Sequence, residues 1–230
     1  MMRLDKFLSE AGAGSRKELK TMIRGGRVKV DGVVEKSPDR KIDEMAMSVT
    51  VDGGEVRLRG QVVLMLHKPA GFVTSTADPR DRTVMELLPE EFRNLGLFPV
   101  GRLDKETEGL LLFTNDGDLG HRLTAPKHQV EKEYYAETDG VPDAADVEAF
   151  RQGITLRDGT VCLPAELYLE GTGCRVVVRE GKYHQVRRML ASRGKPVTYL
   201  RRIREGQLTL GGLRKGECRL LNPDEVELLL

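Results

Sequence analysis

FPVGRLDKETEGLLLFTNDG, residues 98–117, contains two short apolar runs separated by a polar loop. Short apolar runs bounded by Gly, Asn and Asp are typical of buried β-strands. We therefore expect core strands at residues 97–100 and 110–113, with Asp104 on the short loop between them. A carboxylate on such an anchored loop can be aimed at a bound molecule, although the spacing also fits an Asp that only caps a turn.

The composition is that of a globular protein. The chain has 230 residues, of which 39% are hydrophobic and 32% charged, so it forms one large domain or one small and one medium domain. No apolar run approaches the ~18 residues that a membrane span needs. Charges interrupt the apolar stretch at the N-terminus, which is not typical of a secretory signal. We therefore expect a cytoplasmic protein.

The cysteines and the distribution of charge indicate what kinds of site and partner to expect. Cys162, Cys174 and Cys218 are an odd number and far apart, which favours buried free thiols over disulfides or a zinc site. The net charge is only +1, yet residues 1–30 hold eight Lys/Arg against three acids, and residues 175–204 hold ten against one. Two such basic segments indicate a polyanionic partner. The alternative is that each is simply a solvated charged face.

The N-terminal pattern predicts a small domain of two helices and strands. Apolar residues within 4–11 recur at helical spacing, Ser15 and Glu18 form a capping box for a second helix, and residues 27–30 alternate as a strand. Short apolar pairs and turns follow, so we expect one domain over residues 1–59 and another over 60–230. The polar side of the first domain carries Arg16, Lys17, Lys20, Arg24, Arg27 and Lys29.

The second domain reads as alternating strands and short helices. Expected strands are 62–66, 130–136, 165–169, 174–179 and 197–203, and expected helices are 84–88, 119–124, one from Pro142 carrying Val147, Phe150 and Ile154, one around 185–190 ending near Gly194, and 223–230. In the helix at 185–190, Arg187 projects beside the apolar stripe. A partly buried Arg requires an anion.

Five motifs resemble those of RNA pseudouridine synthases, specifically the family of ribosomal small-subunit pseudouridine synthase A. They are K-P-x-G from Lys68, G-R-L-D from Gly101, T-x-G-L-L-L-x-T-N-D-G from Thr107, K-x-Y from Lys132 and E-G-x-x-H-Q-V-R-R-M from Glu180. The first domain resembles the S4-type RNA-binding domain, whose basic face binds the RNA backbone. Phosphate neutralisation by Lys and Arg is largely independent of sequence.

The resemblance implies an α+β protein: a small helix–helix–strand RNA-binding domain and a catalytic domain built on a mixed, largely antiparallel sheet with a central cleft. The implied activity is isomerisation of a uridine to pseudouridine in ribosomal RNA, most closely 16S rRNA, by a monomer without cofactor or metal. The partner would be the RNA or a partly assembled ribosomal subunit, with no membrane involved. Further RNA contacts would come from Arg102, Lys182, Arg188, Arg201 and Arg202. Lys68 would either approach a phosphate or only cap the turn at Pro69 to Gly71.

The same resemblance assigns the catalytic roles. Asp104 would be the catalytic carboxylate, Arg187 its cationic partner and Tyr134 the residue placed on the target base. A nearby Arg favours the charged form of a carboxylate in a dry pocket. Extruding the base costs a few kcal/mol, which stacking at ~1–3 kcal/mol per base offsets. Tyr135 would face the other side of the strand and is the core alternative, and His184 fits a general base or a polar residue that begins a helix.

Other interpretations remain open. A non-catalytic RNA-binding or ribosome-assembly protein would not need Asp104. A glycoside hydrolase would pair Asp104 with Glu106 or Glu108, although a chain without Trp and with 5% aromatic residues is poorly suited to bind sugars. Within the family, enzymes for 23S rRNA share these motifs, whereas the S-T-x-D-P-x-x-x-T-V loop at 75–84 is closer to the small-subunit enzyme. Arg187 also stands where some of those enzymes carry Lys.

Overall fold

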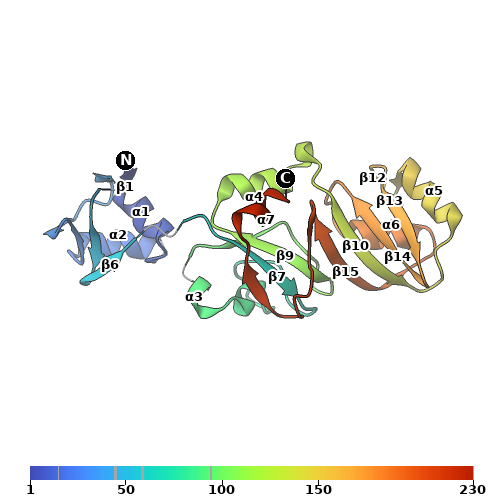
Figure 1. Cartoon of the computed structure of the whole chain (residues 1–230), viewed down its shortest axis with the longest axis horizontal. Helices are drawn as coiled ribbons and strands as arrows, with labels where there is room; N and C mark the ends of the chain where they lie inside the picture. The colour runs from blue at the N-terminus through green and yellow to red at the C-terminus, as the bar shows by residue number, and fades with distance from the viewer. Residues whose placement is uncertain (15, 44–45, 58–59, 94, 230) are drawn as a thin grey trace. The chain divides into compact units, whose positions relative to one another are not determined.

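The computed structural model describes residues 1–14, 16–43, 46–57, 60–93 and 95–229, and the chain forms two compact units (Figure 1). The first unit comprises Met1–Val62 with Leu88–Phe98, and the second comprises Val63–Leu87 with Pro99–Leu230. None of the described helices is long and apolar enough to cross a membrane.

The first unit has the predicted pair of helices and a small sheet. Helices α1 (Leu4–Glu10) and α2 (Arg16–Arg24) pack together, and Leu4, Phe7 and Leu8 are buried as their spacing predicts. Ser15, the predicted helix cap, lies outside the described residues. The remaining elements are β1 (Met2–Arg3), β2 (Val28–Val30), β3 (Val33–Val34), β4 (Lys41–Ile42), β5 (Val49–Val51), β6 (Gly54–Val56) and α3 (Glu90–Arg93), with sheet orders β3-β2-β5-β6 and β1-β4.

The second unit is built on one large mixed sheet (Figure 1), with the order β13-β14-β10-β15-β9-β7-β17. Pairing is antiparallel along this path except between β15 and β9, which are parallel. The α+β prediction with a mixed, largely antiparallel sheet is confirmed. The strands are β7 (Val63–Lys68), β8 (Phe98–Val100), β9 (Glu108–Thr114), β10 (Lys132–Thr138), β11 (Ile154–Thr155), β12 (Val161–Cys162), β13 (Glu166–Glu170), β14 (Gly173–Val178), β15 (Val197–Glu205), β16 (Leu208–Thr209) and β17 (Cys218–Leu220).

Short helices connect these strands. They are η1 (Val84–Leu87), α4 (Gly117–Thr124), η2 (Pro126–His128), α5 (Ala144–Gln152), α6 (Gln185–Ser192) and α7 (Pro223–Glu227). The prediction that α5 reaches Ile154 is wrong: Gly153, at φ 86°, ends the helix, and Ile154 begins β11. On α6 the predicted stripe of Val186, Met189 and Leu190 is buried in the core, together with the thiol-bearing Cys162 and Cys174.

The parallel contact between β9 and β15 depends on Gly109. This residue lies opposite Arg202 of β15 and has φ +108°, a conformation that residues with a side chain rarely adopt. An ideal Cβ at this position would lie 2.1 Å from the Arg202 carbonyl oxygen and 2.7 Å from its nitrogen. Glycine is therefore required where the two antiparallel halves of the sheet meet.

Candidate active site

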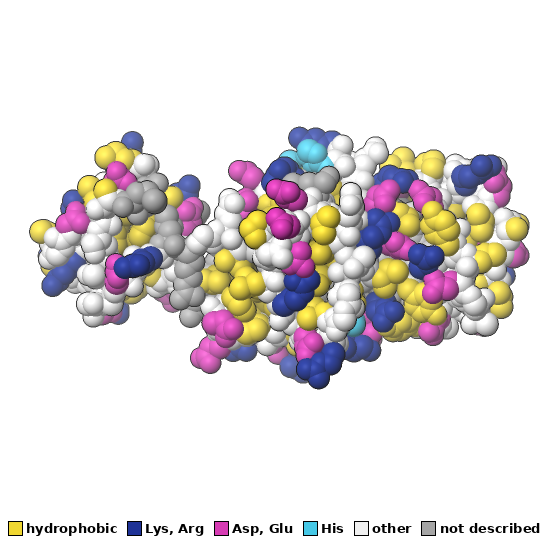
Figure 2. Space-filling model, viewed as in Figure 1, with side chains coloured by type: hydrophobic (Ala, Val, Ile, Leu, Met, Phe, Trp, Pro, Cys, Tyr) yellow, Lys and Arg dark blue, Asp and Glu magenta, His cyan; other side chains and the backbone are white. Residues whose placement is uncertain are grey.

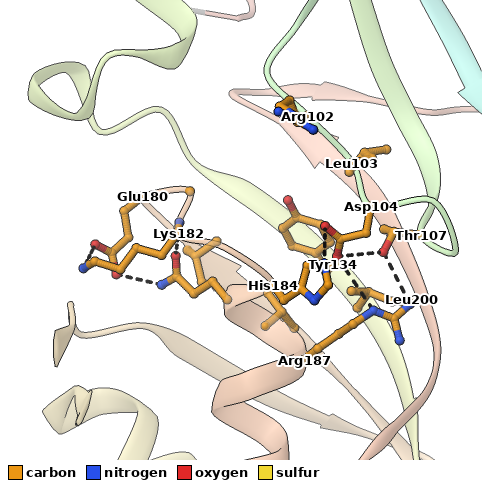
Figure 3. A pocket seen from close by; sticks show the side chains of 14 residues that line it. Arg102, Leu103, Asp104, Thr107, Tyr134, Glu180, Lys182, His184, Arg187 and Leu200 are labelled. Atoms are coloured by element: carbon orange, nitrogen blue, oxygen red, sulfur yellow. Dashed lines mark hydrogen bonds and ion pairs between the residues drawn. The ribbon is translucent and has the colours of Figure 1, made fainter. Parts of the chain in front are cut away.

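One pocket of the second unit contains the three residues to which the sequence assigns catalytic roles. Asp104 comes from the loop before β9, Tyr134 from β10 and Arg187 from α6, and all three line the same pocket (Figure 3). The loop, strand and helix meet beside the parallel β9–β15 pair. The fold therefore assembles residues that lie up to 83 positions apart in the sequence.

The carboxylate of Asp104 lies between two side chains from the start of α6, the N-cap residue His184 and Arg187. Its Oδ1 is 3.3 Å from Nε2 of His184, and its Oδ2 is 3.8 Å from Nε of Arg187. Thr107 adds a long hydroxyl contact of 3.5 Å to Oδ2, and its backbone N–H donates to the Asp104 carbonyl. The Asp104 side chain remains 33% exposed. The carboxylate is thus oriented, yet still accessible to a bound molecule.

Arg187 also bonds to the loop that carries Asp104. Its Nη2 donates to the Glu106 carbonyl at 3.3 Å and to the Thr107 hydroxyl at 3.4 Å. The sequence predicted an anion for a partly buried Arg at this position, and Asp104 is that anion. The close approach of His184 to Asp104 cannot be predicted from local sequence patterns, because none of them indicates that the residue before α6 turns toward the loop.

The aromatic pair on β10 divides between the two faces of the sheet. Tyr134 lines the pocket, whereas Tyr135 packs edge-on against Tyr199, with ring centroids 6.4 Å apart. Burial raises the pKa of the Tyr134 phenol, so the group is protonated at neutral pH. Tyr134 therefore presents a protonated phenol at the pocket. Its position on the opposite face from Tyr135 follows from the alternation of side chains along a strand.

Lys68 is a buried side chain that holds the backbone of the Asp104 loop. Its ammonium donates to the carbonyl oxygens of Pro69, Asp104, Lys105 and Thr107 at 2.8–3.1 Å, and the residue is 0% exposed. The prediction that Lys68 contacts RNA is wrong, because no phosphate can reach it. Burial lowers the pKa of Lys68 to about 8, so the cation persists at neutral pH and fixes the loop.

Replacing Lys68 by Met is expected to lower the free energy of unfolding by roughly 3 kcal/mol, because several buried carbonyls lose a charged donor. Urea unfolding at pH 7 measures the loss. Lys127→Met, at an exposed position, serves as the control and should change stability by less than about 0.5 kcal/mol. A Lys68→Met protein as stable as this control would contradict the anchoring role.

Arg202 is likewise a structural residue. It is 1% exposed, donates through Nε to the Leu110 carbonyl at 2.7 Å, and lies 3.2 Å from the buried carboxylate of Glu205. The prediction that Arg202 contacts RNA is therefore wrong, because its guanidinium is buried in the protein interior. Arg202 pairs with Tyr134 across β15 and β10, so its side chain lies on the same face of the sheet as Tyr134 and bonds to the phenol from the buried side.

The other residues predicted to contact RNA differ in how exposed their side chains are and in whether they already pair with an acidic residue. Arg102 is exposed and lies apart from the Asp104 carboxylate (Figure 3). Lys182 bonds to Glu180 and the Val161 carbonyl, Arg188 pairs with Asp158, and Arg201 is half-buried on β15. In the first unit the side chains of Lys17, Lys20, Arg24, Arg27 and Lys29 are exposed, and the side chain of Arg16 lies outside the described part of the chain.

Much of the basic segment 175–204 is neutralised locally. Acidic side chains from β10 and the residue before it, from β13 and from α5 pair with its cations, and Figure 2 shows the two charge types interspersed on the visible face. The pairs are Arg175 with Glu133 and Glu170, Arg179 with Glu131 and Glu166, Arg204 with Glu131 and Glu133, and Arg193 with Asp146. For these residues the alternative of a solvated charged face is the correct one.

The carboxylates near Asp104 do not form the acid pair of a glycoside hydrolase. Glu108 is buried and accepts from Tyr199 at 2.8 Å, and Lys215 pairs with it at 2.8 Å. Burial opposes ionisation, but Lys215 and Tyr199 together hold the pKa of Glu108 below its usual value. A carboxylate engaged in this way is not available as a general acid, and Glu106 is exposed on the loop.

Comparison with known proteins agrees with this geometry. The family described as RNA pseudouridylate synthase matches residues 62–192, and the S4 domain family matches residues 2–48. The chain is 43% identical to ribosomal small subunit pseudouridine synthase A of Vibrio cholerae over 98% of both chains. It is 40% identical to an uncharacterized RNA pseudouridine synthase of Bacillus subtilis, covering 99% of this chain and 98% of that one.

A solved structure supports the same assignment. A crystal structure of a pseudouridylate synthase superposes with a TM-score of 0.70 at 32% identity, and each chain is covered completely. The match to the family covers more than half of the chain, and it includes Asp104, Tyr134 and Arg187. This chain therefore belongs to the RNA pseudouridine synthases and carries an S4-type RNA-binding region at its N-terminus.

Proposed function

We propose that the protein isomerises a specific uridine of ribosomal RNA to pseudouridine, in 16S rRNA, and that Asp104, Tyr134 and Arg187 perform the reaction. The observation that carries the proposal is the Asp104 carboxylate, which is held in the pocket within 3.8 Å of the Arg187 guanidinium. The choice of 16S rRNA is supported by the Vibrio cholerae relative, whose name specifies the ribosomal small subunit.

The reaction breaks the N-glycosidic bond of a uridine and rejoins the base to the sugar through C5, and a proton moves from C5 to the freed ring nitrogen. Asp104 supplies the carboxylate at the reacting nucleotide, and Arg187 orients it. Tyr134 offers its ring to the extruded base, and its protonated phenol can take part in the movement of the proton.

The first domain, residues 1–59, holds the RNA while residues 60–230 carry out the chemistry. Its exposed Lys and Arg side chains bind phosphates and release counterions, which gives affinity with little dependence on sequence. Arg102, exposed at the same pocket as Asp104, contacts the RNA near the reacting nucleotide. The physiological partner in this account is 16S rRNA, alone or in a partly assembled small subunit.

Tritium release from C5-labelled uridine tests the choice of RNA. Transcripts of 16S and 23S rRNA are incubated with the protein, each with and without its ribosomal proteins, and the released tritium is counted. We expect release from 16S rRNA only. Release from 23S rRNA only would overturn the proposed target and leave the reaction intact, whereas no release from either RNA would favour a protein that only binds RNA.

Arg187→Ala is expected to lower the single-turnover rate by about 10²- to 10³-fold, since it removes the cation beside the reacting carboxylate. Arg187→Lys keeps a charge without the planar fork, so its rate should lie between those of Arg187→Ala and wild type. Arg151→Ala, which removes an exposed Arg of α5, is the matched control. An Arg187→Ala rate equal to that of the control would exclude this role for Arg187.

A further inference from the structure

An exposed aromatic ring lies next to the pocket. Tyr183 is 74% exposed, although the chain has only five Tyr, six Phe and no Trp. Its ring is stacked on that of His184, with centroids 3.9 Å apart and planes inclined by 16°. His184 covers one face of the tyrosine, so the exposed surface of Tyr183 includes the other face of the ring.

His184 links this stacked pair to the reacting carboxylate. It lines the pocket, and its Nε2 lies 3.3 Å from Oδ1 of Asp104. Its backbone is in the left-handed region at φ 48°, ψ 35°, directly before α6. A residue other than glycine is uncommon in this conformation, and such strain concentrates at functional sites. The strained turn directs the imidazole toward Asp104 and stacks it on Tyr183.

The turn beneath the pair is held by a small polar network. Gln185 is buried, donates to Glu180 at 2.7 Å and accepts from the Lys182 backbone N–H at 3.0 Å. Glu180 also accepts from the Leu163 backbone N–H at 2.9 Å. These contacts hold the backbone on both sides of Tyr183, and the stack on His184 is the contact that orients the ring.

We propose that Tyr183, backed by His184, is a stacking platform for an unpaired base of the substrate RNA that neighbours the target uridine. This inference rests on the proposed function and adds a second base-binding position to it. A rigid aromatic face exposed beside the reaction pocket suits a nucleobase, because every base presents a π-face. Arg188 donates to the Tyr183 carbonyl and so helps to hold the segment that presents the ring.

The platform would offset one cost of the reaction. Extruding a uridine breaks its stacking on the adjacent base. Tyr183 would capture that adjacent base outside the pocket while Tyr134 takes the target base inside it. Because His184 contacts both Tyr183 and Asp104, the platform lies at a fixed distance from the carboxylate. The two bases would therefore be held apart by Tyr134 on β10 and Tyr183 in the turn before α6.

Substitution of Tyr183 tests the platform. Tyr183→Ala is expected to raise KM for the rRNA fragment about 5- to 150-fold, the range for losing one stacked base, with kcat within about threefold of wild type. Tyr183→Phe keeps the ring and should retain the wild-type KM. Tyr168→Ala is the matched control, because Tyr168 is a tyrosine 46% exposed on β13, whereas Tyr183 lies between the pocket-lining Lys182 and His184. Equal KM values for Tyr183→Ala and this control would overturn the proposal.

A double-substitution cycle identifies the ligand as a base. The uridine that the wild-type protein modifies is located first, in 16S or 23S rRNA. If the target is not in 16S rRNA, the fragment is taken from the other RNA and the test is otherwise unchanged. Fragments are then prepared with a single abasic site at each of the positions flanking that uridine. At one position, the abasic site and Tyr183→Ala should together raise KM no more than either change alone. If the increases in KM from the abasic site and from Tyr183→Ala multiply at every flanking position, the proposal is overturned.

Discussion

Asp104→Asn is expected to abolish pseudouridine formation, with a loss of at least about 10⁴-fold in the single-turnover rate, as for other enzymes that lose their central reactive group. The amide has nearly the shape of the carboxylate but lacks its charge and basicity. Asn cannot attack the nucleotide or take a proton from it. Tritium release from the labelled rRNA fragment measures the rate.

Two controls separate lost chemistry from lost structure. The Asp104→Asn protein should bind the rRNA fragment with a Kd within about threefold of wild type, because the phosphate contacts that dominate affinity are unchanged. Glu106→Gln, two residues along the same loop and exposed, should retain wild-type activity. Tritium release that survives Asp104→Asn would mean that another group performs the reaction.

Gly109→Ala is expected to destabilise the second unit by more than about 4 kcal/mol, or roughly 10 °C in Tm. The added methyl would overlap the Arg202 backbone at the parallel β9–β15 contact, 2.1 Å from its carbonyl oxygen, and the strands would have to separate. Thermal unfolding followed by circular dichroism measures the change. Activity should fall as well, because Arg202 lies opposite Tyr134 in the sheet.

Gly117→Ala is the matched control for this substitution. Gly117 begins α4, no atom lies within 4 Å of the position of its added Cβ, and its φ is not in the left-handed region. Alanine at such a site should leave stability unchanged or raise it slightly. If Gly109→Ala unfolds at the same temperature as Gly117→Ala, the close approach of the two strands is not present in solution.

Local sequence patterns were sufficient to predict most elements of the fold. The apolar runs around Asp104 became β8 and β9, and the alternation at residues 130–136 placed Tyr134 and Tyr135 on opposite faces of β10. The helix predicted to reach Ile154 failed because a glycine with positive φ ends it two residues earlier. Apolar spacing alone does not distinguish a helical residue from the first residue of a following strand.

Long-range pairing explains the residues that were misassigned. Lys68 and Arg202 look like surface cations in the sequence, yet both are buried and donate to backbone carbonyls far away in the chain, Lys68 to those of Asp104 and Thr107 and Arg202 to that of Leu110. A buried Lys or Arg is rare without partners, and those partners become visible only when the sheet is assembled. The same holds for His184, whose contact with Asp104 spans 80 positions.

The structure of the Asp104→Asn protein bound to an rRNA fragment containing the target uridine tests the central claim most directly. We expect the uridine to be extruded into the pocket, its base against Tyr134 and its reacting atoms within about 3.5 Å of the residue 104 side chain. A target uridine that remains stacked in the RNA, or that occupies a site away from residue 104, would contradict the assignment of this pocket as the active site.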